Sequence, residues 1–150
     1  MNIDTIGKPE SDDGYFEKMC FVIFQAGLSR AMLERKWPGI RKAFCEFALE
    51  TVSGFSPDNI EALLGNPDVI RNRTKINAIV KNAQEIDRLV IEFGSFELYL
   101  RSLWEKGDER FVREAVSARF KFMGKPTTVM FLVSVGEEMP LSLADCQIHH

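Results

Sequence analysis

Histidine is scarce in this chain, and its scarcity excludes several kinds of catalytic site. The only two histidines, His149 and His150, stand at the very end of the sequence. A Ser/His or Cys/His nucleophile pair is therefore not expected. With Cys146 the histidines would supply three zinc ligands, but no spaced Cys/His pair offers a fourth, and they equally match the remnant of a purification tag. We predict no metal site.

Cysteines, long apolar runs and phosphate-binding loops are also few or missing. The three cysteines lie far apart, and an odd count in an apolar setting predicts free thiols in a reducing cytosol. No apolar run reaches the roughly 18 charge-free residues of a membrane span, and the acidic N-terminal segment does not resemble a signal peptide. Neither GxxxxGK[ST] nor GxGxxG occurs. We therefore expect a cytosolic protein with no cofactor and no membrane partner.

Positive charge is not in excess either. Lysine and arginine total 19 against 22 acidic residues, which gives a net charge of -3. Binding to a polyanion would therefore require basic residues gathered on one face against an acidic remainder. Three regions offer such residues, although a cluster of this kind, taken alone, is more often a solvated helix face. They are Arg30, Arg35, Lys36, Arg41 and Lys42; Arg71, Arg73 and Lys75; and Arg119, Lys121 and Lys125.

What the chain does contain predicts a single all-α domain. Its 150 residues are 45% hydrophobic and 27% charged, as expected of a soluble globular protein. Apolar residues recur at three- and four-residue spacing, and no alternating strand pattern of useful length is present. We predict a loose lead-in over residues 1–13. A compact multi-helix domain with eight or nine short helices and a helix-hairpin-helix motif is expected over 14–150.

Capping residues and apolar periodicity predict individual helices. The segment from Tyr15 is nearly apolar all round and is expected at the centre of the domain. Ser29 should cap a helix that ends at Trp37, and Pro38 should open a separate short helix. Further starts are expected at Ser56 and Ser95, and the longest helix should end at a glycine, Gly94.

The segment 118–136 predicts the end of one helix, a tight basic hairpin and the start of an apolar helix. Gly124 is expected to take the positive φ of the hairpin, and Pro126 suits the first turn of the following helix. The free N–H groups of that turn, near Lys121 and Lys125, suit a phosphate of a nucleic-acid backbone. The alternative is an ordinary corner between two helices with solvated lysines.

Several short blocks, taken in order, resemble the DNA-3-methyladenine glycosylase I family over roughly residues 14–145. The blocks are Ile23-Phe-Gln-Ala-Gly-Leu-Ser29, Lys36-Trp-Pro-Gly39, Arg41-Lys-Ala-Phe44, Ile70-Arg-Asn-Arg-Thr-Lys-Ile76, Asn82-Ala83, Gly94-Ser-Phe96 and Phe120-Lys-Phe-Met-Gly124. That family belongs to the all-α helix-hairpin-helix DNA glycosylases. Its members flip a damaged base out of duplex DNA and hydrolyse its N-glycosidic bond.

The resemblance implies roles for particular residues. The loop of Gln25, Ala26, Gly27 and Leu28 would insert into the gap left by the flipped nucleotide. The hairpin would hold a phosphate through backbone N–H groups near Gly124, assisted by Lys121, Lys125 and Thr127. The base pocket would fall at Val22, Phe24, Arg30 and Trp37. Val22 stands where the family has its lesion-recognising glutamate, Arg30 where it has a tryptophan, and the family's N-terminal zinc ligands have no counterpart among residues 1–19. The chain looks closer to a second branch of the family, which has no zinc site.

One further residue is a catalytic candidate. In the wider superfamily an aspartate about twenty residues beyond the hairpin glycine stabilises the developing sugar charge, and Asp145 lies 21 residues beyond Gly124. Its alternative role is that of a helix-terminal carboxylate. The expected partner is double-stranded DNA with an alkylated base or an abasic site, bound by a monomer at the nucleoid of a prokaryotic cytosol. The alternatives are a catalytically weak module that binds distorted DNA and, least supported, a protein-binding scaffold.

Overall fold

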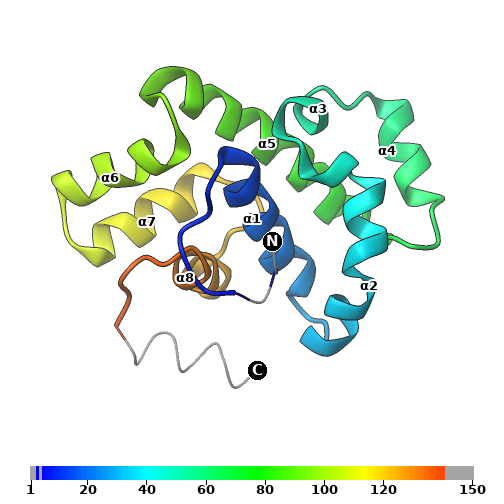
Figure 1. The fold of residues 1–150 in the computed structure, drawn as a ribbon, viewed down its shortest axis with the longest axis horizontal. Coiled ribbons are helices and arrows are strands. Elements are labelled where there is room, and N and C mark those ends of the chain that lie inside the picture. The colour runs from blue at the N-terminus through cyan, green and yellow to red at the C-terminus, as the bar shows by residue number, and fades with distance from the viewer. Residues whose placement is uncertain (1–2, 4, 141–150) are drawn as a thin grey trace.

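The computed structural model describes residues 3 and 5–140, and helices make up all the regular structure in that part of the chain (Figure 1). The prediction of an all-α fold is therefore confirmed. The helices are α1 (Asp12–Gln25), α2 (Arg30–Ala43), the 3-10 helix η1 (Cys45–Phe47), α3 (Leu49–Ser53), α4 (Pro57–Leu64), α5 (Arg73–Phe93), α6 (Phe96–Lys106), α7 (Glu109–Arg119) and α8 (Lys125–Ser134).

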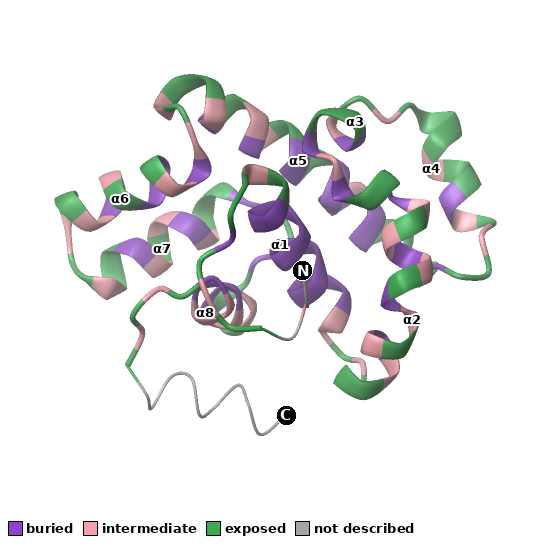
Figure 2. Ribbon diagram, viewed as in Figure 1, coloured by how far each residue is buried: buried purple, intermediate pink, exposed green. Residues whose placement is uncertain are grey.

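Helix α1 lies at the centre of the domain, as its composition predicts. Every residue from Gly14 to Phe24 is buried, and Figure 2 shows this helix as the most continuously buried one. It packs against α5 on one side and α8 on another. A helix that is apolar all round has no face to offer to water, so other helices must cover it on every side.

Side-chain caps fix where several helices begin. Ser29, Ser56 and Ser95 each accept a hydrogen bond from a backbone N–H of the first turn, as predicted. Such a cap stabilises a helix by about 1 kcal/mol. Gly94 ends α5 with φ 97°, a conformation that glycine adopts without steric cost. Ser11 also caps α1, which consequently begins at Asp12 and not at Tyr15.

The prediction that Pro38 opens a separate helix is wrong. Pro38 lies inside α2, which continues without a break from Arg30 to Ala43. Proline removes one hydrogen bond from a helix interior and crowds the preceding turn. Leu33, Trp37 and Ile40 lie on either side of it and are all buried. Their packing into the core keeps the two halves of the helix in line.

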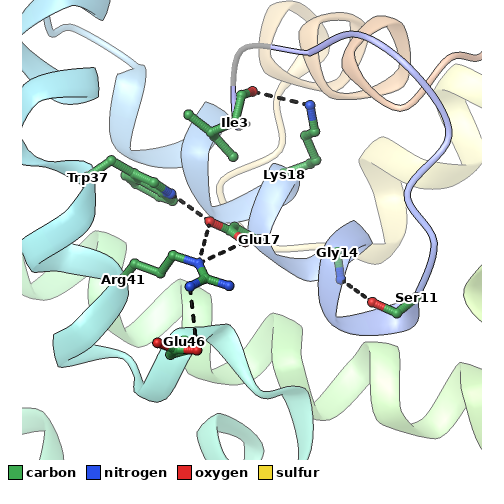
Figure 3. Close-up of polar contacts among 8 residues, drawn as sticks. All are labelled: Ile3, Ser11, Gly14, Glu17, Lys18, Trp37, Arg41 and Glu46. Carbon is green, nitrogen blue, oxygen red and sulfur yellow. Dashed lines mark hydrogen bonds and ion pairs between the residues drawn. The ribbon is translucent and has the colours of Figure 1, made fainter. Parts of the chain in front are cut away.

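The described residues before α1, which are 3 and 5–11, form no helix or strand, and hydrogen bonds hold them against the domain. The backbone N–H of Gly7 donates to the carbonyl of Ser134 at 3.1 Å, at the C-terminal end of α8. The buried Lys18 ammonium donates to the Ile3 carbonyl at 3.2 Å (Figure 3). It also donates to the Thr5 carbonyl. In the part of the chain that the structure describes, no helix combines the length and the hydropathy that a membrane span requires.

Candidate nucleic-acid interface

Helix α5 brings together two segments that are far apart in the sequence. One is the 25–29 turn between α1 and α2, and the other is the 120–124 hairpin between α7 and α8. Lys75 contacts the turn and Asn82 contacts the hairpin. These two side chains are seven residues apart, which is two helical turns, so they lie on the same side of α5. The turn and the hairpin therefore share one platform.

The 25–29 turn is short and is fixed mainly through its carbonyl groups. Leu28 N–H donates to the Gln25 carbonyl at 2.8 Å, and Gly27 has φ 82°. A side chain at Gly27 would meet no atom within 4 Å, so this residue stands clear of the rest of the domain. Lys75 Nζ donates to the carbonyls of Phe24 at 3.0 Å and Ala26 at 2.7 Å. These carbonyls belong to the end of α1, where no helical N–H is available to pair with them.

The Lys75 side chain is buried, with 5% of its surface exposed. Burial lowers the pKa of Lys75, because it removes water from the charged ammonium. The group makes no ion pair with any residue of the described part of the chain. The ammonium also lies over the Phe122 ring, whose centroid is 5.7 Å from Nζ. A cation over an aromatic face is attracted by the ring quadrupole, so Lys75 also touches the hairpin.

Asn82 holds the 120–124 hairpin through both ends of its amide. Its Nδ2 donates to the Lys121 carbonyl at 2.8 Å, and its Oδ1 accepts from the Lys121 N–H at 2.7 Å. Asn82 as a whole is 1% exposed, so these bonds satisfy buried polar groups. At the other end of the hairpin, the Met123 carbonyl accepts from the hydroxyls of Ser117 and Thr128 at 2.7 and 2.9 Å.

The prediction of a positive φ at Gly124 is wrong. The left-handed residue of the hairpin is Phe122, with φ 59°, whereas Gly124 has φ -64° and ψ 175°. The chain reverses two residues earlier than expected because Asn82 fixes the backbone at Lys121. Gly124 instead occupies the N-cap of α8, and a side chain there would meet no atom within 4 Å. Its lack of a side chain leaves open space directly before the helix.

The first turn of α8 has free hydrogen-bond donors. No side chain caps this helix, and its first internal bond runs from Thr128 N–H to the Gly124 carbonyl at 2.9 Å. The backbone N–H groups of Lys125 and Thr127 therefore lack an internal partner, and Pro126 has none to satisfy. Gly124 and Lys125 are exposed, and Thr127 is half-buried. An exposed helix start of this kind suits an anion.

Only part of the predicted basic set is available to a ligand. Lys121 and Lys125 are exposed and make no ion pair with a described residue. Arg119 pairs with Glu85 at 2.7 Å, which raises the pKa of Arg119 and ties α7 to α5. The other pairs that engage cations of this set are Arg30 with Glu34, Arg41 with Glu17 and Glu46, and Arg73 with Glu61.

The four predicted base-pocket residues lie around the C-terminal half of α1. Val22, Phe24 and Trp37 are buried, and the Arg30 guanidinium lies over the Phe21 ring at 5.3 Å. Trp37 stacks on Phe47 at a centroid distance of 5.1 Å. These side chains form part of one aromatic cluster, and the assignment of a pocket to them stays a prediction.

A buried carboxylate that the sequence analysis did not single out anchors this cluster. Glu17, 5% exposed, accepts a hydrogen bond from Trp37 Nε1 at 2.8 Å and one from Arg41 Nε at 3.2 Å (Figure 3). Its only signal in the sequence is an acidic residue that, with Lys18, interrupts the otherwise apolar run from Tyr15 to Phe24. These contacts orient the indole ring and hold Arg41, whose side chain is 39% exposed, against α1.

The catalytic candidate Asp145 lies outside the described residues, as do Ser142, Cys146, His149 and His150. Within the described part no group of three or more His, Cys, Asp or Glu side chains is arranged to hold a metal ion.

Comparison with known proteins links this arrangement to one family. The family model described as methyladenine glycosylase matches residues 4–119, which include the 25–29 turn and all of α5. The chain is 40% identical over 79 residues to a DNA-3-methyladenine glycosylase of Haemophilus influenzae, covering 52% of this chain and 43% of the relative. It is 35% identical over 79 residues to DNA-3-methyladenine glycosylase 1 of Escherichia coli, covering 52% of this chain and 42% of that protein. The matched region thus spans less than half the length of these curated relatives.

Solved structures extend the similarity beyond the hairpin. A variant of 3-methyladenine DNA glycosylase I in complex with 3-methyladenine superposes with a TM-score of 0.77 and 25% identity, over 89% of this chain and 82% of that one. The enzyme from Staphylococcus aureus has the same fold, with a TM-score of 0.77 and 24% identity, over 90% of this chain and 82% of that chain.

Proposed function

This chain belongs to the methyladenine glycosylase family, and on that basis we propose that it is a base-excision repair glycosylase. It flips alkylated bases such as 3-methyladenine out of duplex DNA and hydrolyses their N-glycosidic bond. The observation that carries the proposal is the shared platform on α5, where Lys75 and Asn82 hold the 25–29 turn and the 120–124 hairpin. A base-flipping enzyme needs one element to fill the gap in the duplex and another to hold the backbone beside it.

The geometry of the two segments supports this division of work. The 25–29 turn presents an exposed glycine, Gly27, beside a half-buried Leu28, which suits insertion between base pairs. The α8 helix start offers unpaired N–H groups and two free cations, Lys121 and Lys125, which suit a phosphate. Gly124 leaves room for the phosphate to approach the backbone closely.

The chemistry demands little of the protein beyond positioning. Alkylation at N3 leaves adenine positively charged, so the base departs as a neutral molecule when the glycosidic bond breaks. Water supplies the hydroxyl that ends on C1′ and releases a proton. The protein must extrude the base and stabilise an oxocarbenium-like sugar. We assign that stabilisation to Asp145. The reaction requires no metal and no covalent lysine, and Lys121 and Lys125 serve the phosphates.

The proposal is tested by incubating the protein with methylated duplex DNA and measuring released bases by chromatography. Release of 3-methyladenine or 7-methylguanine supports a glycosylase. The second candidate is a non-catalytic module that binds distorted DNA, and it is favoured by Val22, an apolar residue where the resemblance expects a glutamate. Tight binding to an abasic-site duplex without base release supports that module.

The assignment of Asp145 has its own test. Asp145→Asn should abolish excision while leaving affinity for abasic DNA unchanged, because an amide cannot stabilise the cationic sugar. Unchanged excision removes Asp145 from the mechanism. Loss of both excision and binding indicates a structural role.

We also propose that the chain acts as a monomer on nucleoid DNA in a prokaryotic cytosol. Both curated relatives come from bacteria, where the chromosomal DNA that needs repair lies in the cytosol. Light scattering coupled to size-exclusion chromatography tests the oligomeric state, and a mass of twice 17.1 kDa would overturn it.

A further inference from the structure

We propose that Lys75 is a positioning residue that couples the 25–29 turn to the 120–124 hairpin, so that the two DNA-binding segments act as one unit. This inference rests on the proposed function, because it names the residue that sets the geometry of that same site. It follows from three contacts of a single ammonium group. Two of these go to carbonyls at the end of α1, and the third goes to the Phe122 ring.

Lys75 determines where the 25–29 turn stands. The carbonyls of Phe24 and Ala26 have no helical partner, and Lys75 Nζ donates a hydrogen bond to each, at 3.0 and 2.7 Å. Gly27, next in the chain, has a left-handed φ of 82°, and a Cβ placed there would meet no atom within 4 Å outside its chain neighbours. A glycine in open space is permissive by itself. The ammonium thus supplies a contact from outside the turn that fixes its conformation at this point.

Lys75 also fixes the tip of the hairpin. Phe122 is 39% exposed and has φ 59°, a conformation that is uncommon for a bulky residue. The Lys75 cation beneath its ring favours this orientation, since the ring face is negative. Any displacement of Phe122 by bound DNA changes the surroundings of the ammonium. That change reaches the carbonyls of the turn directly, because the same group binds them.

Burial distinguishes Lys75 from the cations that would bind phosphate. Lys75 has 5% of its surface exposed, so its ammonium cannot contact a phosphate of bound DNA. Lys121 and Lys125 are exposed and can do so. A phosphate-binding lysine contributes to the salt dependence of affinity, because binding releases counterions from the DNA. A positioning lysine alters affinity at every salt concentration by the same factor.

The chain offers a closely matched control in Lys18. Its ammonium is also buried, at 3% exposure, and also donates to two backbone carbonyls, those of Ile3 and Thr5. It holds the N-terminal segment, which is bonded through Gly7 to the end of α8 remote from the hairpin. Lys75→Met and Lys18→Met therefore remove the same kind of contact from two different places.

The experiment compares K75M, K18M and the unchanged protein in binding to an abasic-site duplex from 50 to 300 mM salt. We expect K75M to bind at least tenfold more weakly with an unchanged salt slope, and K18M to bind normally. K75R, which keeps the charge and the donors, should recover most of the loss. Equal affinities for K75M and K18M, or a salt slope lowered by about one in K75M, would overturn the proposal.

Amide hydrogen exchange without DNA tests the coupling independently of the proposed function. K75M should accelerate exchange in both the 25–29 turn and the 120–124 hairpin, and K18M in neither. Acceleration in the turn alone overturns the coupling. Should the unchanged protein neither bind abasic DNA nor release bases, the proposed function fails while this exchange result still decides the role of Lys75. If K75M does not fold, K75Q, which keeps a donor without the charge, replaces it.

Discussion

At the scale of single residues, the carboxylate of Glu17 is buried and depends on hydrogen bonds from neighbouring side chains. It accepts hydrogen bonds from Trp37 and Arg41, and its side chain is 6% exposed. Replacing it by leucine leaves the indole N–H unpaired and Arg41 without its buried partner. We expect Glu17→Leu to lower the free energy of unfolding by about 2–4 kcal/mol, measured by urea denaturation.

Glu61 provides the control for that measurement. It also pairs with an arginine, Arg73, at 2.6 Å, but both side chains are exposed. Surface ion pairs contribute little, so Glu61→Gln should leave the urea midpoint unchanged. Equal effects of the two substitutions would show that burial does not set the value of the Glu17 contacts.

Glu137 gives a pH dependence of defined sign. Burial raises the pKa of Glu137, even though Trp104 Nε1 donates to its carboxylate at 3.0 Å and opposes the shift. The folded state therefore favours the protonated form. Its stabilising contribution is present below the unfolded pKa of about 4.3 and is lost as the pH rises through the folded value. The urea midpoint of Glu137→Gln minus that of the unchanged chain should therefore be larger at pH 7 than at pH 4. The reverse order would contradict the assigned direction.

At the scale of helices and turns, the two exposed glycines of the interface should respond differently to alanine. Gly124 has φ -64° and open space around it, so Gly124→Ala should leave stability within about 0.5 kcal/mol. The added methyl group occupies the space proposed for a phosphate, and affinity for abasic DNA should fall about tenfold. Fluorescence anisotropy measures the affinity, and urea denaturation the stability.

Gly27→Ala is the companion variant. Gly27 has φ 82°, where a side chain costs about 1 kcal/mol whatever the space around it. The substitution should therefore lower stability measurably.

For Gly124→Ala, an unchanged affinity for abasic DNA would mean that no phosphate approaches the α8 start.

Local signals account for most of the helices that could be predicted from the sequence. A cap such as Ser56 and a periodic apolar face act within a few residues, so a short window contains them. The errors at Pro38 and Gly124 arose where distant residues decide. Core packing of Trp37 and Ile40 carries α2 through Pro38, and Asn82, on another helix, moves the left-handed residue from Gly124 to Phe122.

At the scale of the whole molecule, the site depends on helix packing that the sequence pattern does not contain. In the folded domain, the cations of the predicted basic clusters differ in burial and in ion pairing. Lys75 is buried and holds backbone carbonyls, Arg119 is paired with Glu85, and Lys121 and Lys125 remain exposed. The sequence shows that all of these residues are cations. Their surroundings in the folded domain determine which of them can bind a phosphate. The hairpin was predictable, and its attachment to α5 was not.

The overall charge of the molecule gives the last prediction. A chain with a net charge of -3 repels DNA at long range, so binding must depend on a few local phosphate contacts. Each neutralised phosphate contributes about 0.9 to the slope of log affinity against log salt. K121A and K125A together should lower the slope for an abasic duplex by about two. Lys106 is the control, since it is the exposed cation at the α6 end, separated from the hairpin by the length of α7. K106A should leave the slope unchanged. An equal reduction by K106A would mean that the charge of the whole molecule, and not the hairpin, governs its attraction to DNA.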